Sequence, residues 1–213
     1  MQGLTDIFLH LDVHLAELVG RYGVWVYGLL FAIIFAETGL VITPFLPGDS
    51  LLFAAGALAA TGALDVRWLF LLLAAAAVLG NTVNYSIGRF IGPRVFRADE
   101  SHWLLNKQYL DRAHAFFEHY GGKAVVLTRF VPIIRTFVPF VAGAGAMRYS
   151  VFAMYNLAGG LLWVGICVGA GYLFGNVPVI KNNFSLVALG IVAVSLIPMA
   201  VEWVKHKKKG QRG

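Results

Sequence analysis

The chain has 213 residues, of which 59% are hydrophobic and 13% are charged, and its mean hydropathy is +0.73. Soluble domains average about 45–50% apolar and about 25% charged residues, so an ordinary soluble protein is excluded and one membrane domain over 1–213 is predicted. The net charge of +6 includes a basic tail at 205–213, and no aromatic-interleaved basic surface points to nucleic acid as a partner. The single cysteine, Cys167, excludes an intramolecular disulfide framework.

The first elements in the chain are an amphipathic segment and an apolar run. Residues 1–21 carry apolar side chains at helical spacing with a polar opposite face, which predicts a helix lying in the membrane interface. Residues 22–42 are apolar and long enough to cross about 30 Å of hydrocarbon. A second span is predicted at 68–91, so that 22–91 contains two crossings with a broken segment between them.

The broken segment, 43–62, is too short for two further crossings. Pro44 and Pro47 stop a helix, Gly48 permits a tight bend, and Asp49 or the serine after it can cap a second short helix. Irregular backbone at membrane depth is tolerated only where it is buried in protein or faces a watery cavity. We therefore predict a re-entrant hairpin here.

The second half of the chain has a similar order of elements. The polar segment 92–123 predicts an amphipathic stretch on the cytoplasmic surface. Residues 124–204 then give a second re-entrant hairpin, interrupted by Pro132 and Pro139, and two more spans at 150–174 and 184–204. The basic tail that follows places the C-terminus in the cytoplasm by the positive-inside rule.

The predicted fold is therefore an all-α polytopic membrane protein. It has about four spanning helices, two oppositely oriented re-entrant broken-helix hairpins forming an inverted repeat, and amphipathic interfacial helices. The repeat has an imperfect register: Thr43 and Thr128 are 85 positions apart, whereas Gly56 and Gly143 are 87 apart, so a slip of two residues is required. Broken helices in inverted repeats are how many secondary transporters build a site at mid-membrane.

Four charged residues mark the candidate site. Glu37 and Asp49 flank the first break, and Arg129 and Arg135 flank Pro132 in the second. Ionisable groups in hydrocarbon are costly and usually functional. A guanidinium suits phosphate oxygens, which makes the arginines candidate substrate ligands, while the two acids are candidates for proton coupling.

A structural alternative remains open: the two acids neutralise the two arginines in buried ion pairs that hold the hairpins together. Within the span 68–91, Asn81, Asn84 and Tyr85 are expected to form hydrogen bonds between helices. No cofactor or metal site is expected. An enzyme is not expected either, because nucleophile-elbow and metalloprotease motifs are absent from the sequence.

In combination and order, several motifs resemble the DedA family of bacterial inner-membrane proteins, part of the SNARE-associated Golgi, or VTT-domain, group. They are Glu37-Thr-Gly, Pro44-x-x-Pro47-Gly48-Asp49-Ser50, Gly80-Asn-x-x-Asn84-Tyr85-x-x-Gly88-Arg89, Arg129-Phe-x-Pro132-x-x-Arg135 and Phe140-x-Ala-Gly143. The chain departs from the family pattern at Asn81, where related chains carry an acid.

The resemblance implies two facing hairpins, a bacterial inner-membrane location and a role in envelope homeostasis. It also implies that Glu37, Asp49, Arg129 and Arg135 are essential. The leading hypothesis is a flippase for a phosphate-headed lipid, undecaprenyl phosphate first, with protons as a coupling partner. A phospholipid flippase or scramblase, a proton-coupled ion or drug transporter, and a membrane-protein assembly factor are the alternatives. The sequence leaves cargo, direction and homo-oligomerisation open.

Overall fold

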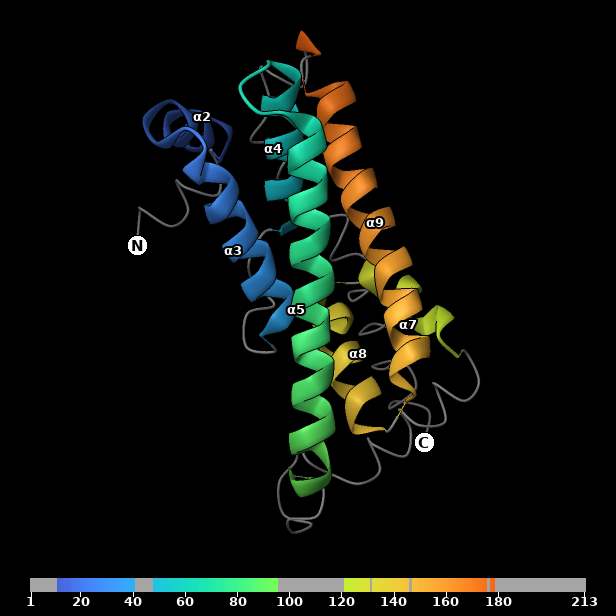
Figure 1. The fold of residues 1–213 in the computed structure, drawn as a ribbon. Helices are drawn as coiled ribbons and strands as arrows, with labels where there is room; N and C mark the ends of the chain where they lie inside the picture. The colour runs from blue at the N-terminus through green and yellow to red at the C-terminus, as the bar shows by residue number, and fades with distance from the viewer. Residues whose placement is uncertain are drawn as a thin grey trace, which may run out of the picture. The chain divides into compact units, whose positions relative to one another are not determined.

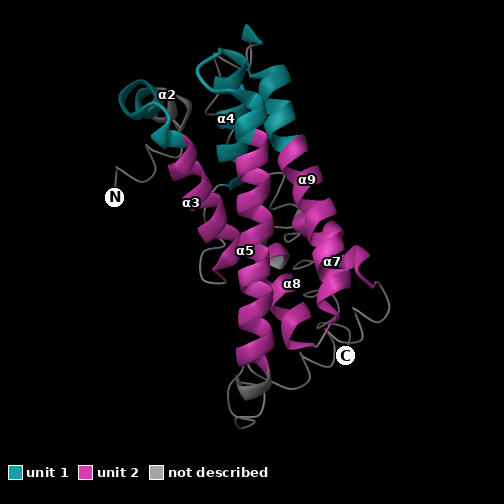
Figure 2. Ribbon diagram, viewed as in Figure 1, with its two compact units in different colours: residues 1–26, 47–69, 166–213 teal, residues 27–46, 70–165 magenta. Residues whose placement is uncertain are grey.

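The computed structural model describes residues 11–40, 48–95, 121–130, 132–145, 147–175 and 177–178. All of the regular elements in these ranges are helices (Figure 1). The chain divides into two compact units (Figure 2). Unit 1 comprises 1–26, 47–69 and 166–213, and unit 2 comprises 27–46 and 70–165.

Among the residues that the structure describes, two helices are long and apolar enough to cross a membrane. These are α5, Val66–Val95, and α9, Tyr149–Phe174, and each has a mean hydropathy of 1.8 over its candidate span. They confirm the helices predicted at 68–91 and 150–174. On α9, Leu157, Leu162 and Leu173 are between 48% and 69% exposed, as expected for side chains that face lipid.

The predicted span at 22–42 is shorter in the structure. Helix α2, Leu11–Tyr22, ends at Gly23, whose φ of 52° lies in the left-handed region that favours glycine. Helix α3 then runs over Trp25–Gly39, and its 15 residues rise about 22 Å, less than the thickness of the hydrocarbon core. The break at the glycine agrees with the boundary predicted between the amphipathic segment 1–21 and the apolar run, whereas the length of the span was overestimated.

The first predicted hairpin is described only in part. Helix α4, Gly48–Ala60, begins at the glycine that was expected to form the bend, and Asp49 lies in its first turn. Pro44 and Pro47 lie outside the described residues, as do the span predicted at 184–204, the tail 205–213 and most of the segment 92–123. A re-entrant path through the membrane therefore stays a prediction.

The second broken segment contains three short helices: α7, Lys123–Leu127, the 3-10 helix η1, Thr128–Phe130, and α8, Pro132–Ala144. The helix resumes at Pro132, where the missing N–H costs nothing because the first turn has no intrahelical acceptor. The prediction that Pro139 interrupts the segment is wrong, because α8 continues through it. Pro139 removes one hydrogen bond, to the Arg135 carbonyl, and α8 is packed closely against α5 on both sides of it.

Glycines join α8 to α5 within unit 2. A Cβ on Gly88 would overlap the Phe140 carbonyl, one on Gly92 would overlap Ala144, and one on Gly143 would overlap the Tyr85 carbonyl. The two backbones are therefore in direct contact, which only glycine permits.

The same set of contacts joins α4 to α9 within unit 1. A Cβ on Gly171 would overlap the Phe53 carbonyl, one on Gly175 would overlap Ala57, and one on Gly56 would overlap the Val168 carbonyl. The two sets of contacts correspond residue by residue. Phe53, Gly56 and Ala57 precede Phe140, Gly143 and Ala144 by 87 positions, and Tyr85, Gly88 and Gly92 precede Val168, Gly171 and Gly175 by 83. Each short helix thus packs in the same way on a long one, and the 87-residue register is the one that the contacts support.

Adding one methyl group at this contact should destabilise the protein. In Gly171→Ala the new Cβ meets backbone of α4, which cannot rotate away, so we expect the free energy of unfolding to fall by about 1–3 kcal/mol. Gly169→Ala, two residues earlier on α9, is the matched control because a Cβ there meets nothing within 4 Å. Thermal unfolding in detergent measures both. Equal melting temperatures for the two variants would contradict the described packing.

Candidate functional site

The site in unit 2 begins where α3 ends against α5. Gly39 approaches Gly80 so closely that a Cβ on Gly39 would lie 3.3 Å from the Gly80 Cα. A Cβ on Gly80 would overlap the Thr38 hydroxyl. This close crossing places Glu37 and Thr38, both buried, beside the middle of α5.

Asn84 connects three helices at this level. Its side chain is fully buried, and Nδ2 donates to the Thr38 carbonyl of α3 at 3.3 Å and to the Thr136 carbonyl of α8 at 2.7 Å. Next to it on α5, Tyr85 donates to the Met147 carbonyl and its ring stacks on Phe152, with centroids 4.4 Å apart. The interhelical hydrogen bonds predicted for Asn84 are confirmed, whereas Tyr85 bonds to Met147, which lies between α8 and α9 and not in a helix.

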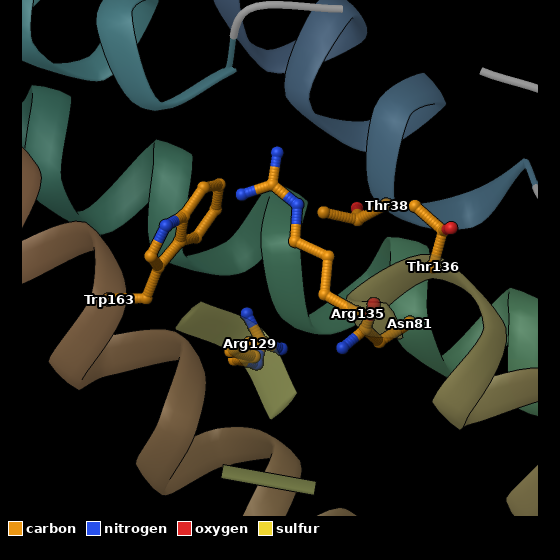
Figure 3. A pocket seen from close by; sticks show the side chains of 6 residues that line it. All are labelled: Thr38, Asn81, Arg129, Arg135, Thr136 and Trp163. Atoms are coloured by element: carbon orange, nitrogen blue, oxygen red, sulfur yellow. The ribbon is translucent and has the colours of Figure 1, made fainter. Parts of the chain in front are cut away.

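The first of the two arginines is in a buried ion pair. Arg135 of α8 donates through Nη2 to Oε1 of Glu37, with exposed side-chain fractions of 8% and 0%. Its guanidinium also lies over the Trp163 ring of α9, 4.9 Å from the centroid, and Figure 3 shows the two side chains next to each other. The Glu37 carboxylate and the aromatic face of Trp163 therefore both hold Arg135.

The second arginine is held by neutral amides. Arg129 of η1 is 3% exposed, and its Nη2 donates to Oδ1 of Asn156 on α9 at 2.5 Å. With its amide oxygen toward the guanidinium, Asn81 accepts from the same Nη2 at 2.7 Å and donates to the Thr38 carbonyl at 3.3 Å. Among the described residues, no carboxylate pairs with Arg129 and its buried Nε has no hydrogen-bond partner.

Glycines on α9 make room for Arg129. A Cβ on Gly159 would lie 3.1 Å from the Arg129 Cδ, and one on Gly160 would lie 2.8 Å from Val78 and 3.5 Å from the Arg129 Nη2. The sequence left open whether these glycines pack inside one chain or between two. In the structure they border Arg129 of their own chain.

A cavity lies between the two arginines (Figure 3). It is lined by Thr38, Asn81, Arg129, Arg135, Thr136 and Trp163. Its volume of about 10 Å³ is near the minimum that holds one water molecule, far less than a phosphate head group needs. The described conformation is therefore closed to a lipid head group.

Charge in this site is not balanced. The buried charged side chains in the described part of the chain are Glu37, Arg129 and Arg135, which leaves an excess of one positive charge. The structural alternative of two ion pairs is thus observed for Arg135 and not for Arg129. Asp49 belongs to unit 1, where it lies half-buried in the first turn of α4.

The sequence analysis missed Asn156, Trp163 and Thr38. Asn156 is a fully buried amide in the middle of an apolar span, a signal that would have identified it. Trp163 lies in the span predicted at 150–174, where nothing distinguished it from its neighbours, and it is buried. Thr136 lies about one turn into α8, which begins at Pro132.

Comparison with known proteins places the chain in a family. Residues 46–173 match the VTT domain. The chain is 53% identical to protein DedA of Escherichia coli K12 over 211 residues, 98% of this chain and 96% of that protein. It is 45% identical over 184 residues to an uncharacterized membrane protein of Mycobacterium tuberculosis, covering 85% of this chain and 80% of the relative.

It is also 39% identical over 197 residues to the inner membrane protein YqjA of Escherichia coli K12, covering 88% and 87% of the two chains. No solved structure matches it. The domain match and the near full-length identity confirm the family that the sequence resembles. The chain belongs to the DedA family of inner-membrane proteins, whose shared unit is the VTT domain.

Proposed function

We propose that this protein is a flippase that moves a phosphate-headed lipid across the bacterial inner membrane, with undecaprenyl phosphate as its cargo. The observation that carries the proposal is the unbalanced charge at Arg129, a buried guanidinium with neutral ligands and an Nε that lacks a partner among the described residues. A buried cation without a counter-ion is costly, so a site of this kind favours an anion.

The chemistry of the two arginines suits a phosphate monoester. A guanidinium offers planar, paired donors that match phosphate oxygens, and it keeps its charge in an apolar setting. The compact head group of undecaprenyl phosphate can enter a protein site while its long tail stays in lipid. The cavity is too small for it in the described conformation, so the helices must separate and Glu37 must give up Arg135 to the incoming phosphate.

Glu37 and Asp49 are the groups that we assign to proton coupling. When phosphate displaces Glu37 from Arg135, the buried carboxylate loses this counter-ion, and binding a proton would neutralise it. Loss of that proton restores the ion pair with Arg135 and releases the lipid. Asn81 cannot titrate, so the relay in unit 2 rests on Glu37.

The decisive experiment follows labelled undecaprenyl phosphate and labelled phosphatidylethanolamine in liposomes that contain only this protein. Selective movement of undecaprenyl phosphate supports the flippase, and dependence on a pH gradient supports the role of the acids. Equal movement of both lipids would identify a scramblase. If neither lipid moves in folded protein, the proposal is wrong, and an ion carrier or an assembly factor takes its place.

Trp163 should contribute to the same activity to a smaller extent. Trp163→Leu removes the aromatic face that holds Arg135 when Glu37 leaves it, and a cation–π contact is worth about 0.5–2 kcal/mol. We expect the initial rate of undecaprenyl phosphate movement to fall roughly 3- to 30-fold. Trp163→Phe, which keeps a weaker aromatic face, should lie between wild type and the leucine variant. If the leucine variant kept the wild-type rate, the contact would have no part in transport.

A further inference from the structure

We infer that Asn156 is a positioning residue that holds Arg129 in place without neutralising it, and so reserves this guanidinium for the phosphate of the cargo. The inference deepens the proposed function and rests on it for the identity of the ligand. It assigns different tasks to the two arginines: Arg129 is the permanent anion anchor, and Arg135 is released to the ligand only when Glu37 leaves it.

The orientation of Asn156 is determined by its other hydrogen bonds. Its Nδ2 donates to the Val78 carbonyl at 3.0 Å and lies 3.4 Å from the Thr82 hydroxyl, both on α5. Because the amide nitrogen is committed to α5, the oxygen must face Arg129, which it does at 2.5 Å. Asn156 thus links α9, α5 and η1 through one buried amide.

The amide supplies position without charge. A carboxylate at this distance would cancel most of the field of the guanidinium, as Glu37 does for Arg135. An amide oxygen gives a charge-assisted hydrogen bond and leaves the net charge intact. Asn81 adds a second neutral acceptor to the same Nη2, at 2.7 Å.

The remaining donors of Arg129 indicate a ligand. Both amide oxygens converge on Nη2, whereas Nε is buried and has no partner among the described residues. Arg129 also lines the cavity next to Arg135. The positive charge of Arg135 acts on Arg129, and once Glu37 has left Arg135 an anion between the two arginines would be attracted by both. The geometry is that of an anion site with one anchor already fixed.

The test compares two substitutions at one position in the full-length protein. Asn156→Asp has the same shape and adds a negative charge, whereas Asn156→Ser removes the amide and adds none. The probe is farnesyl phosphate, with farnesol as the uncharged control, and binding is measured by calorimetry in detergent. We expect Asn156→Asp to weaken farnesyl phosphate binding about 100-fold, and Asn156→Ser to weaken it less than about 10-fold. Thermal unfolding of each variant reports separately on folding.

A purely structural role predicts the reverse order. Asn156→Ser would then be the more damaging variant, since it loses every side-chain hydrogen bond of the amide, and that result would overturn the inference. A second comparison uses the Arg129→Gln background, where Asn156→Asp should cause no further loss of binding because it acts through Arg129. An equal loss in both backgrounds would also overturn it, and so would wild-type protein that binds farnesyl phosphate no better than farnesol.

The proposed function can fail separately. Wild-type protein that binds farnesyl phosphate in an Asn156-dependent way but moves no undecaprenyl phosphate in liposomes would support the anion site and contradict the flippase.

Discussion

Replacing Arg129 with glutamine should abolish selective movement of undecaprenyl phosphate while leaving the protein at least as stable as wild type. The variant removes a buried charge that no carboxylate among the described residues compensates, and such charges destabilise a fold. It also removes the anion anchor, so the rate of translocation should fall roughly 100-fold or more. Transport in liposomes and thermal unfolding in detergent measure the two effects on the same preparation.

This combination separates a ligand-binding arginine from a structural one. If Arg129 served mainly to hold η1 against α9, glutamine would lower the melting temperature and the loss of transport would follow from unfolding. Arg129→Lys is the useful companion: it keeps the charge and lacks the planar fork, so we expect partial activity. Full activity of Arg129→Gln would exclude the proposed site.

The second large effect is expected at Glu37. Glu37→Gln removes the carboxylate that pairs with Arg135, and loss of one partner of a buried ion pair costs about 3–5 kcal/mol of stability. Arg135 keeps its charge and loses the Glu37 carboxylate, so farnesyl phosphate should bind at least about 10-fold more tightly. Transport should nevertheless fall, because no carboxylate remains to take Arg135 back from the phosphate. The measurement is binding and flux on one variant, which should change in opposite directions.

A double variant controls for the loss of stability. Glu37→Gln combined with Arg135→Gln leaves no broken pair, so much of the melting temperature should return while transport stays absent. Binding and flux that fall together in Glu37→Gln, in protein that is still folded, would show that Glu37 supports the fold and takes no part in releasing the ligand.

Hydropathy predicted the long helices well because burial in lipid acts on whole segments. It overestimated the length of the span predicted at 22–42, of which α3 covers only Trp25–Gly39. The proline rule failed at Pro139, whose ring was expected to break α8 and is accommodated within it. Both depend on local backbone geometry, to which average composition is insensitive.

The candidate site was predictable in its charges and not in its pairing. Charged residues in apolar sequence identified Glu37, Arg129 and Arg135 without any structure. The sequence does not indicate which arginine forms an ion pair with Glu37, because Glu37 and Arg135 are 98 positions apart and lie on different helices. The neutral ligand Asn156 was overlooked for the same reason: a single amide becomes informative only when its neighbour is known to be a guanidinium.

The glycine contacts also impose an order on folding during synthesis. Helix α5, with Tyr85 and Gly88, is synthesised before α8, with Phe140 and Gly143. The helix on which α8 packs is therefore already present when α8 emerges. Helix α4 can contact α2 as soon as both have been synthesised. Gly56 of α4, however, packs on the carbonyl of Val168, which is synthesised 112 residues later. Unit 2, which contains Arg129, can thus complete its helix packing before unit 1 does. A nascent chain that ends shortly after residue 165 lacks the part of α9 on which α4 packs. Helix α4, with Asp49 in its first turn, should then still expose the face that α9 covers in the finished protein.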